Sequence, residues 1–432
     1  MKLQNQQAHF YGWTNAVLLF SIYLITVGLV FYGFAAIFPA MIKATGWGRG
    51  EAAMAHTIHM IFSAFLTPVV AVTLNRFGGR KTLALGLMIL LAGLSLLGTV
   101  ANELWQWIFI WGFIVSFGLA FASLLSVQTI IMFWFDTRRT VVLGLAMSGA
   151  AVGGFVAQPF FTWLIQQTNS WRTGWLTGVI FVILGLILCF FVRSKPEDVG
   201  QYPYGLNPDE AETIAADGSI KVHTYRTSVP WSLAEALKTR ALYLIGAFMI
   251  AHIMSVSMVV SHGVLHLTDL EYTRMQAASV LSAMLLGSGV ARVPMGWLGD
   301  LIEPRWIATA AMTLMLTAFI GIWQAPNHVS VIIFGFVFGF SYGTALVMMP
   351  ALFGNFFGPA SFASINGFIV PFMIVCGASV PVGAGYIADN FGSYDPAFII
   401  LSVITAGGVI CTAFLSPPKK TSALESTVKS SS

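Results

Sequence analysis

The amino-acid sequence predicts an all-α membrane protein of twelve transmembrane helices, arranged as two pseudo-symmetric six-helix bundles. Composition is the first indication, because 57% of the 432 residues are hydrophobic and only 9% are charged, against about 25% charged in a soluble domain. The second is the recurrence of apolar stretches of about 20 residues, the length that a helix needs to cross a bilayer. The expected spans are residues 13–40, 52–74, 81–100, 105–134, 141–166, 173–192, 241–267, 275–299, 305–324, 329–353, 361–388 and 395–416.

One long polar stretch, residues 193–240, divides these spans into two sets of six. We interpret it as a cytoplasmic linker between an N-terminal bundle (1–192) and a C-terminal bundle (241–418). The remaining tail, residues 419–432, is polar and rich in serine and threonine, as is typical of a disordered segment. We expect this tail to be cytoplasmic as well.

The distribution of lysine and arginine predicts the orientation, because these residues accumulate in cytoplasmic segments. With both termini inside, 16 of the 21 basic residues fall in inner segments and four in outer loops (Lys43, Arg49, Arg172 and Arg274). We therefore expect a multi-pass protein of the plasma (inner) membrane with cytoplasmic termini. The net charge of +4 lies on one side of the membrane and does not indicate binding to nucleic acid.

The one remaining basic residue, Arg292, lies inside the eighth span, whereas all 17 acidic residues fall in loops or at helix ends. A central arginine costs about 2.5–3.5 kcal/mol on insertion scales, so it usually faces a cavity and a partner. Its planar fork of donors suits a carboxylate, so we expect the substrate to supply the missing negative charge. The alternatives are a guanidinium bound to backbone carbonyls, or one that reaches the inner surface near Asp300, about 12 Å away at helical rise.

Two short basic turns occupy matching places in the two halves. The first holds Ala71 and Asn75 where the second holds Gly296 and Asp300. They resemble the loop signature of the major facilitator superfamily, in which a glycine precedes an aspartate by four residues and a basic turn follows. This resemblance covers nearly the whole chain and implies a transporter that works by alternating access between two repeats. Together with the loop after helix 11, these turns give the positions that we assign to gating and loop motifs: Asn75, Arg76, Gly78, Arg80, Gly296, Asp300 and Asp389.

Within that superfamily the sequence is most similar to the monocarboxylate porters and the oxalate/formate antiporters. The similar segments are residues 75–80, 118–121, 144–149, 290–296 and 389–394. The resemblance implies that Arg292 binds a substrate carboxylate, and that Phe121 and Leu145 line the same site.

Departures from the family pattern narrow the expected substrate. Animal monocarboxylate porters carry a lysine in helix 1 and an aspartate four residues before the helix-8 arginine, whereas this chain has no lysine in helix 1 and has Ser288 at the second place. The oxalate/formate antiporters use a second cation in helix 11, but residues 361–388 contain no lysine or arginine. One cation matches one carboxylate, which favours a monocarboxylate over a dianion.

Histidines and tyrosines are the other candidate polar groups within the spans. His252 and His262 lie in helix 7, and because histidine titrates near neutral pH we expect His262, or failing that His252, to carry a coupled proton. His262, Tyr342 and Tyr32 are also candidate substrate contacts. For each of these side chains, and for His56 and His59 in helix 2, packing between helices is the alternative interpretation.

The predicted function is secondary active transport of a small organic anion such as lactate or pyruvate, by proton symport. Anion exchange of the oxalate/formate type, drug or osmolyte export on the same fold, and a membrane sensor remain alternatives. The sequence has no nucleotide-binding loop and no cluster of metal-ligating residues, so we predict no enzymatic activity and no cofactor. The expected partners are the substrate, a proton and the lipid bilayer, with the monomer as the functional unit.

Overall fold

The computed structural model describes residues 10–206, 224–227 and 229–420, and it confirms the helical fold class. Twelve helical segments in these ranges are long and apolar enough to cross a membrane. Extended pairing in the described ranges amounts to an isolated bridge between Phe135 and Tyr204. Part of the predicted linker and most of the predicted tail lie outside the described residues.

The N-terminal half provides six spans. They are formed by α1 (Tyr11–Tyr23), η1 (Leu24–Phe31) and α2 (Tyr32–Thr45) together; α3 (Arg49–Phe77); α4 (Gly79–Thr99); α5 (Leu104–Phe109), η2 (Ile110–Val115), α6 (Ser116–Phe121) and α7 (Leu124–Trp134) together; α8 (Arg139–Thr168); and α9 (Arg172–Phe191). The short helices η3 (Pro196–Val199) and α11 (Leu233–Ala236) belong to the linker.

The C-terminal half provides the other six, each as one uninterrupted helix. They are α12 (Arg240–Asp269), α13 (Arg274–Leu301), α14 (Pro304–Gln324), α15 (His328–Phe357), α16 (Pro359–Phe391) and α17 (Asp395–Ala413). Most of the twelve spans begin and end within a few residues of the predicted limits. The helices tend to be longer than predicted because they continue past the apolar stretch into polar caps. Asn327, for example, accepts a bond from the Ser330 backbone N–H at the start of α15.

Two of the predicted continuous spans are interrupted, which corrects the sequence-based expectation. The first span contains the π-helical segment η1, and the fourth contains η2 and a break at Ala122 and Ser123. Segments of this type are frequent at functional sites. At η1 the backbone of Gly28 packs directly against Gly153 of α8, where an added Cβ would come within 2.6 Å of the Gly153 Cα. Hydropathy carries no information about this local rewinding.

A ladder of glycines brings α13 and α15 together and fixes the depth of the candidate site. Gly335, Gly339 and Gly343 recur every four residues on α15, so they share one face. They lie against Val280, Met284 and Ser288, which have the same spacing on α13. The next position of that series on α13 is Arg292, so the ladder leads directly to the buried arginine.

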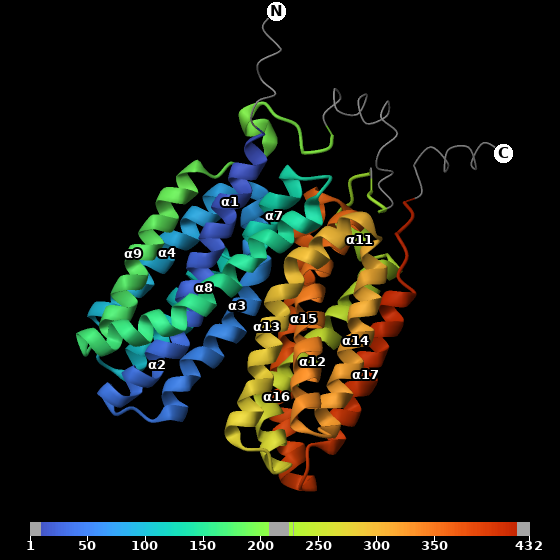
Figure 1. Cartoon of the computed structure of the whole chain (residues 1–432). Coiled ribbons are helices and arrows are strands. Elements are labelled where there is room, and N and C mark those ends of the chain that lie inside the picture. Colours follow the sequence, from blue (N-terminus) through green and yellow to red (C-terminus); the bar gives the residue numbers. More distant parts are fainter. Residues whose placement is uncertain (1–9, 207–223, 228, 421–432) are drawn as a thin grey trace, which may run out of the picture.

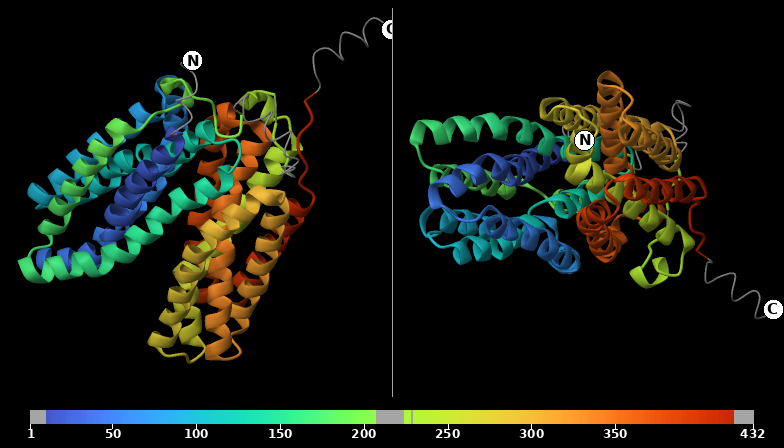
Figure 2. Two further views of the ribbon diagram at one scale, coloured as in Figure 1. Left: turned by 45° about the horizontal axis from the view of Figure 1, so that its top comes forward. Right: turned by 90° about the horizontal axis from the view of Figure 1, so that it is seen from below.

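The two bundles meet at one end and diverge toward the other (Figures 1 and 2). We call the meeting end the linker end, because α9 ends and α12 begins there. Close glycine contacts join the bundles in this half: Gly144 of α8 meets the Arg292 carbonyl of α13, and Gly367 of α16 meets the Ala71 side chain of α3. Small residues allow transmembrane helices to approach closely. We call the opposite end, where the bundles separate, the outer end.

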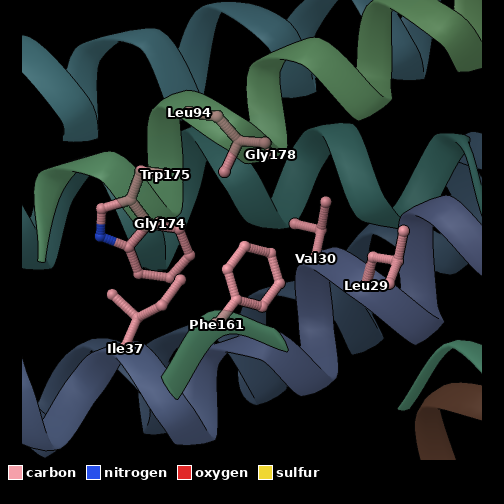
Figure 3. A pocket seen from close by; sticks show the side chains of 8 residues that line it. All are labelled: Leu29, Val30, Ile37, Leu94, Phe161, Gly174, Trp175 and Gly178. Atoms are coloured by element: carbon pink, nitrogen blue, oxygen red, sulfur yellow. The ribbon is translucent and has the colours of Figure 1, made fainter. Parts of the chain in front are cut away.

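An apolar gap lies inside the N-terminal bundle, between Trp175 and Phe161 among other side chains (Figure 3). It has no room for a water molecule. Its lining carries no charged group: Leu29, Val30, Ile37, Leu94, Phe161, Gly174, Trp175 and Gly178. We interpret it as imperfect core packing rather than a substrate site.

The glycine ladder generates a stability prediction. Replacement of Gly339 by alanine places a Cβ 1.8 Å from the Met284 carbonyl oxygen, so α13 and α15 must separate, at a cost of about 1–3 kcal/mol or more. We expect a clear fall in the melting temperature of the purified protein. Gly407→Ala on α17, where nothing lies within 4 Å of the new Cβ, should leave it unchanged or slightly higher. Equal melting temperatures for the two variants would contradict the ladder.

Candidate functional site

The side chain of Arg292 is buried and reaches from the C-terminal bundle to the N-terminal one. Only 7% of the residue is exposed. Its Nη1 donates a 2.7 Å hydrogen bond to the backbone carbonyl of Met147 on α8, and Nη2 lies 3.5 Å from the Ser288 hydroxyl. Its Nε is buried without a hydrogen-bond partner. The guanidinium therefore links the bundles through Nη1, and its other N–H groups can still donate hydrogen bonds.

These contacts bear on two of the alternatives for Arg292, while its binding of a substrate stays a prediction. The side chain does not reach the linker end, because it is buried at about 14 Å of helical rise from the end of α13. It does bind a backbone carbonyl, as one alternative anticipated. It forms no ion pair with any described residue, since the ion pairs in the described ranges join other side chains. Within the described residues, no carboxylate compensates its positive charge.

Two tyrosines, Tyr23 and Tyr342, lie close enough to Arg292 for its charge to act on them. Both also lie within electrostatic range of Tyr32. Tyr342 precedes Gly343 in the ladder, which packs against Ser288, the neighbour of the arginine. The structure thus places Tyr342 and Tyr23 near Arg292, and Tyr32 near these two tyrosines, while their contact with a substrate stays a prediction.

Sequence reasoning missed Tyr23 because a tyrosine in an apolar span carries no distinctive signal by itself. The available signal was its position. Tyr23 and Tyr32 flank η1 on its two sides, and a residue next to a rewound helical segment is a better candidate than one inside a regular helix.

His252 lies beside this group. It is 1% exposed, and its ring stacks on Tyr342 with centroids 5.5 Å apart and planes at 19°. Both ring nitrogens are buried without a partner of good hydrogen-bond geometry, although the Tyr342 backbone lies close enough to interact with the ring. His252 and Arg292 also lie at similar depth, about 26 and 27 Å of helical rise from the outer ends of α12 and α13.

His262, in contrast, lies apart from Arg292, about 10 Å of helical rise from the outer end of α12. Its Nε2 is 2.8 Å from the Pro381 carbonyl of α16, and its Nδ1 is 3.3 Å from the Tyr394 hydroxyl. Pro381 has no N–H and leaves the Gly377 carbonyl without its helical donor, which the Ser257 hydroxyl of α12 replaces at 2.7 Å. His262 and Ser257 thus attach α12 to α16 at its proline.

The two histidines of helix 2 lie in an aromatic cluster of the N-terminal bundle. His59 Nδ1 is 2.6 Å from the Ser116 hydroxyl, and the rings of His56 and His59 stack near Phe31.

Phe121 is buried and stacks on Phe117. Among the residues implied by family resemblance, Leu145 is 37% exposed and lies two residues before Met147 on α8, whereas Phe121 is a core side chain beside the break in the fourth span.

The predicted gating residue Asp300 caps a helix of the opposite bundle. Its two carboxylate oxygens accept 3.0 Å hydrogen bonds from the backbone N–H groups of Thr140 and Val141, in the first turn of α8. A carboxylate at this position satisfies free donors and complements the positive end of the helix dipole. Gly296, one turn earlier, allows the contact, because a Cβ there would lie 2.7 Å from the Thr140 carbonyl oxygen.

The equivalent position in the N-terminal half makes a neutral contact. Asn75 donates to the Ser364 hydroxyl of α16 at 2.7 Å. Gly78 has a positive φ of 82° that ends α3, and the backbone N–H of Arg80 donates to the Ser194 hydroxyl. Arg76 lies over the ring of Phe77.

Asp389 lies elsewhere, exposed near the outer end of α16. The structure therefore groups six of the seven predicted gating residues at the linker end and places Asp389 at the other end.

A second cavity of about 420 Å³ lies at the outer end, between the α12–α13 and α14–α15 loops. It is lined by Leu270, Glu271, Tyr272, Gln276, Gln324, Ala325 and Pro326. None of these is a predicted site residue. The one charged lining residue of this cavity is the acidic Glu271, so its lining does not suit an anion.

Comparison with known proteins now establishes the family. The model described as Major Facilitator Superfamily matches residues 20–271 and 245–430, which together cover nearly the whole chain. The chain belongs to the major facilitator superfamily. It is therefore a membrane transporter and not an enzyme, and its twelve helices form the fold of that superfamily.

Curated relatives within the superfamily are distant but nearly full-length. Monocarboxylate transporter 13 of Rattus norvegicus is 24% identical over 424 residues, covering 92% of this chain and 86% of the relative. An MFS-type transporter of Gibberella moniliformis is 24% identical over 355 residues, covering 81% and 79%. The crystal structure of FucP, a major facilitator superfamily transporter in the outward conformation, matches with a TM-score of 0.70 at 15% identity, covering 95% of this chain and 100% of FucP.

The Asp300 cap predicts how this major facilitator transporter responds to loss of one charge. Asp300→Asn removes the charge and one of the two acceptors, so the linker end should open several-fold more often. The measurement is the distance between spin labels at Phe191 and Phe414, exposed positions on the two bundles near that end. The fraction of long distances should rise. Asp389→Asn is the matched control, and an equal response of both variants would show that the cap does not hold the bundles together.

Proposed function

We propose that the protein is a secondary active transporter of a small monocarboxylate, such as lactate or pyruvate, which binds at Arg292 and crosses the membrane by alternating access with a proton. The observation that carries this proposal is the uncompensated charge of Arg292, buried where the two bundles meet. Buried charges are normally paired. An anionic substrate is the partner that completes the arrangement.

The serine at position 288 favours a counter-ion for Arg292 that comes from the substrate rather than from the protein. An aspartate at this place, as in the animal monocarboxylate porters that the sequence resembles, would neutralise the arginine from one turn away. Here the Ser288 hydroxyl makes only a long 3.5 Å contact with Nη2. The hydroxyls of Tyr23, Tyr32 and Tyr342 would supply neutral donors to the rest of a small substrate.

A site with one cation, Arg292, is not expected to prefer a dianion as its substrate. A dicarboxylate needs a second cation, and the electrostatic neighbours of Tyr23 and Tyr342 include Arg292 and no other basic side chain. The names of the relatives at about 24% identity agree with a monocarboxylate.

The position of the linker predicts which side of the membrane each end of the structure faces. With both termini and the linker in the cytoplasm of a plasma (inner) membrane, as the lysine and arginine bias favours, the closed linker end faces inward and the diverging end faces outward. Substrate would then enter from outside and reach Arg292 near the closed end. The protein would act as a monomer, because each chain holds both bundles.

Removal of the guanidinium is the direct test of substrate binding. Arg292→Ala should abolish saturable uptake of a radiolabelled monocarboxylate into proteoliposomes and weaken binding at least about tenfold, since it removes both the charge and the fork. Arg292→Lys should recover little, because an ammonium is a point charge of different geometry.

Arg305→Ala is the matched control for this test. Arg305 also donates Nη1 to a backbone carbonyl, that of Leu415, at 2.7 Å, but it lies outside the candidate site. Expression and melting temperature of all variants are measured in parallel. Normal uptake by a well-folded Arg292→Ala protein would refute the proposed site and with it the monocarboxylate assignment.

For proton coupling, the stacked position of His252 on Tyr342 favours it over His262 as the carrier. Joint movement of one proton and one monoanion transfers no net charge. Uptake should therefore respond to an imposed pH gradient and not to an imposed voltage alone. His252→Gln should lose accumulation driven by the pH gradient while keeping exchange of labelled for unlabelled substrate, and His262→Gln should retain both.

Three outcomes would count against this scheme. Voltage-driven uptake would show that charge moves. Accumulation against a gradient by the double variant His252→Gln, His262→Gln would exclude a helix-7 histidine as carrier. Obligatory exchange in the wild-type protein, without net uptake, would favour the anion exchanger instead.

A further inference from the structure

Four residues of the linker, Thr224–Thr227, lie across the seam between the bundles at the linker end. Arg226 forms an ion pair with Asp136, with Nη1 3.0 Å from Oδ2. Asp136 lies between α7 and α8 of the N-terminal bundle, and its other carboxylate oxygen pairs with Arg139 at 3.1 Å. Only 15% of the Arg226 side chain and 22% of the Asp136 side chain are exposed, so this pair is better shielded from water than a surface ion pair.

The same segment is bonded to the C-terminal bundle on its other side. The backbone N–H of Tyr225 donates to the Glu303 carboxylate at 2.8 Å, next to the start of α14. The backbone N–H of Thr227 donates to the Asn355 carbonyl of α15 at 2.8 Å. The Asn355 side chain in turn accepts a bond from Arg139 of α8 at 3.3 Å. Asn355 therefore binds both the linker segment and the opposite bundle.

We propose that Thr224–Thr227 is a strap that holds the linker end closed and must leave one bundle before that end can open. The geometry requires this, because the segment has only four residues and contacts Asp136 on one bundle and Glu303 and Asn355 on the other. Separation of α8 from α15 cannot preserve all three contacts. The strap thus makes the linker a determinant of the conformational equilibrium. This role holds for any substrate and does not rest on the assignment of Arg292.

The strap is also held weakly enough to be released. The Thr224 hydroxyl and the Arg226 Nε are buried without hydrogen-bond partners, so the closed position carries a desolvation cost that release removes. Asp136 keeps its contact with Arg139 when Arg226 departs, so the N-terminal bundle is not left with an unpaired buried carboxylate. The ion pair with Arg226 is therefore the contact expected to break first.

The test measures the opening of the linker end without transport. Spin labels at Phe191 and Phe414, in a background without the three native cysteines, report the distance between the bundles. Arg226→Gln should increase the ratio of open to closed molecules by about three- to tenfold. Lys238→Gln, the same loss of charge at an exposed linker position, should leave the ratio at the wild-type value.

A double-mutant cycle separates the strap from a general charge effect. Asp136→Asn should open the linker end at least as much as Arg226→Gln, because it also releases Arg139. Adding Arg226→Gln to Asp136→Asn should change nothing further. Folding of each variant is checked by its melting temperature, and if Arg226→Gln misfolds, Glu303→Ala tests the other attachment with the same expected direction.

Two results would overturn the proposal. One is an Arg226→Gln distribution indistinguishable from that of Lys238→Gln. The other is a fully additive effect of the two strap substitutions, which would mean that Arg226 and Asp136 act independently. Because uptake is not measured, failure here leaves the transport assignment untouched, and loss of uptake in Arg292→Ala leaves the strap untouched.

Discussion

A guanidinium buried between two helical bundles is the constraint on which the arrangement of this protein depends. Arg292 cannot keep its hydration shell at that depth, so its donors must find acceptors within the protein or on a ligand. The structure supplies one acceptor from the opposite bundle, the Met147 carbonyl. That contact is possible only because α8 and α13 approach closely at Gly144, which has no Cβ to meet the Arg292 backbone. The residue proposed to bind the substrate therefore also joins the two bundles.

The bundles meet along two seams, α8 with α13 and α3 with α16. These seams differ in chemistry although the halves are related by sequence. Between α8 and α13, the charged Asp300 caps a helix. Between α3 and α16, Asn75 bonds to a serine hydroxyl. A charge-assisted bond contributes roughly twice as much as a neutral one, so the α8–α13 seam is the stronger. The strap reinforces this side through Asp136 and Arg139. Opening of the linker end is therefore controlled mainly from one seam.

Sequence alone predicts the fold because its cause is visible along the chain: the length of each apolar stretch sets each span. The orientation, inferred from the basic residues, stays a prediction. The burial of Arg292 was predictable for the same reason, because it is the one basic residue inside a predicted span. The partners of the site residues were not. Asp300 binds backbone N–H groups, which every residue has, so no pattern identifies them. Tyr23 lies next to the rewound segment η1, which the sequence does not reveal, and His262 is separated from Arg292 by depth, which depends on how far each helix extends.

The central claim is that the free donors of Arg292 receive the substrate carboxylate while Nη1 stays on Met147. The most direct measurement is an experimental structure of the protein saturated with L-lactate, at a resolution that defines the carboxylate. We predict a carboxylate oxygen about 2.7–3.2 Å from Nη2 or Nε of Arg292, with the bond to Met147 retained and a tyrosine hydroxyl on the substrate. Lactate bound elsewhere, with the Arg292 contacts unchanged, would contradict the account.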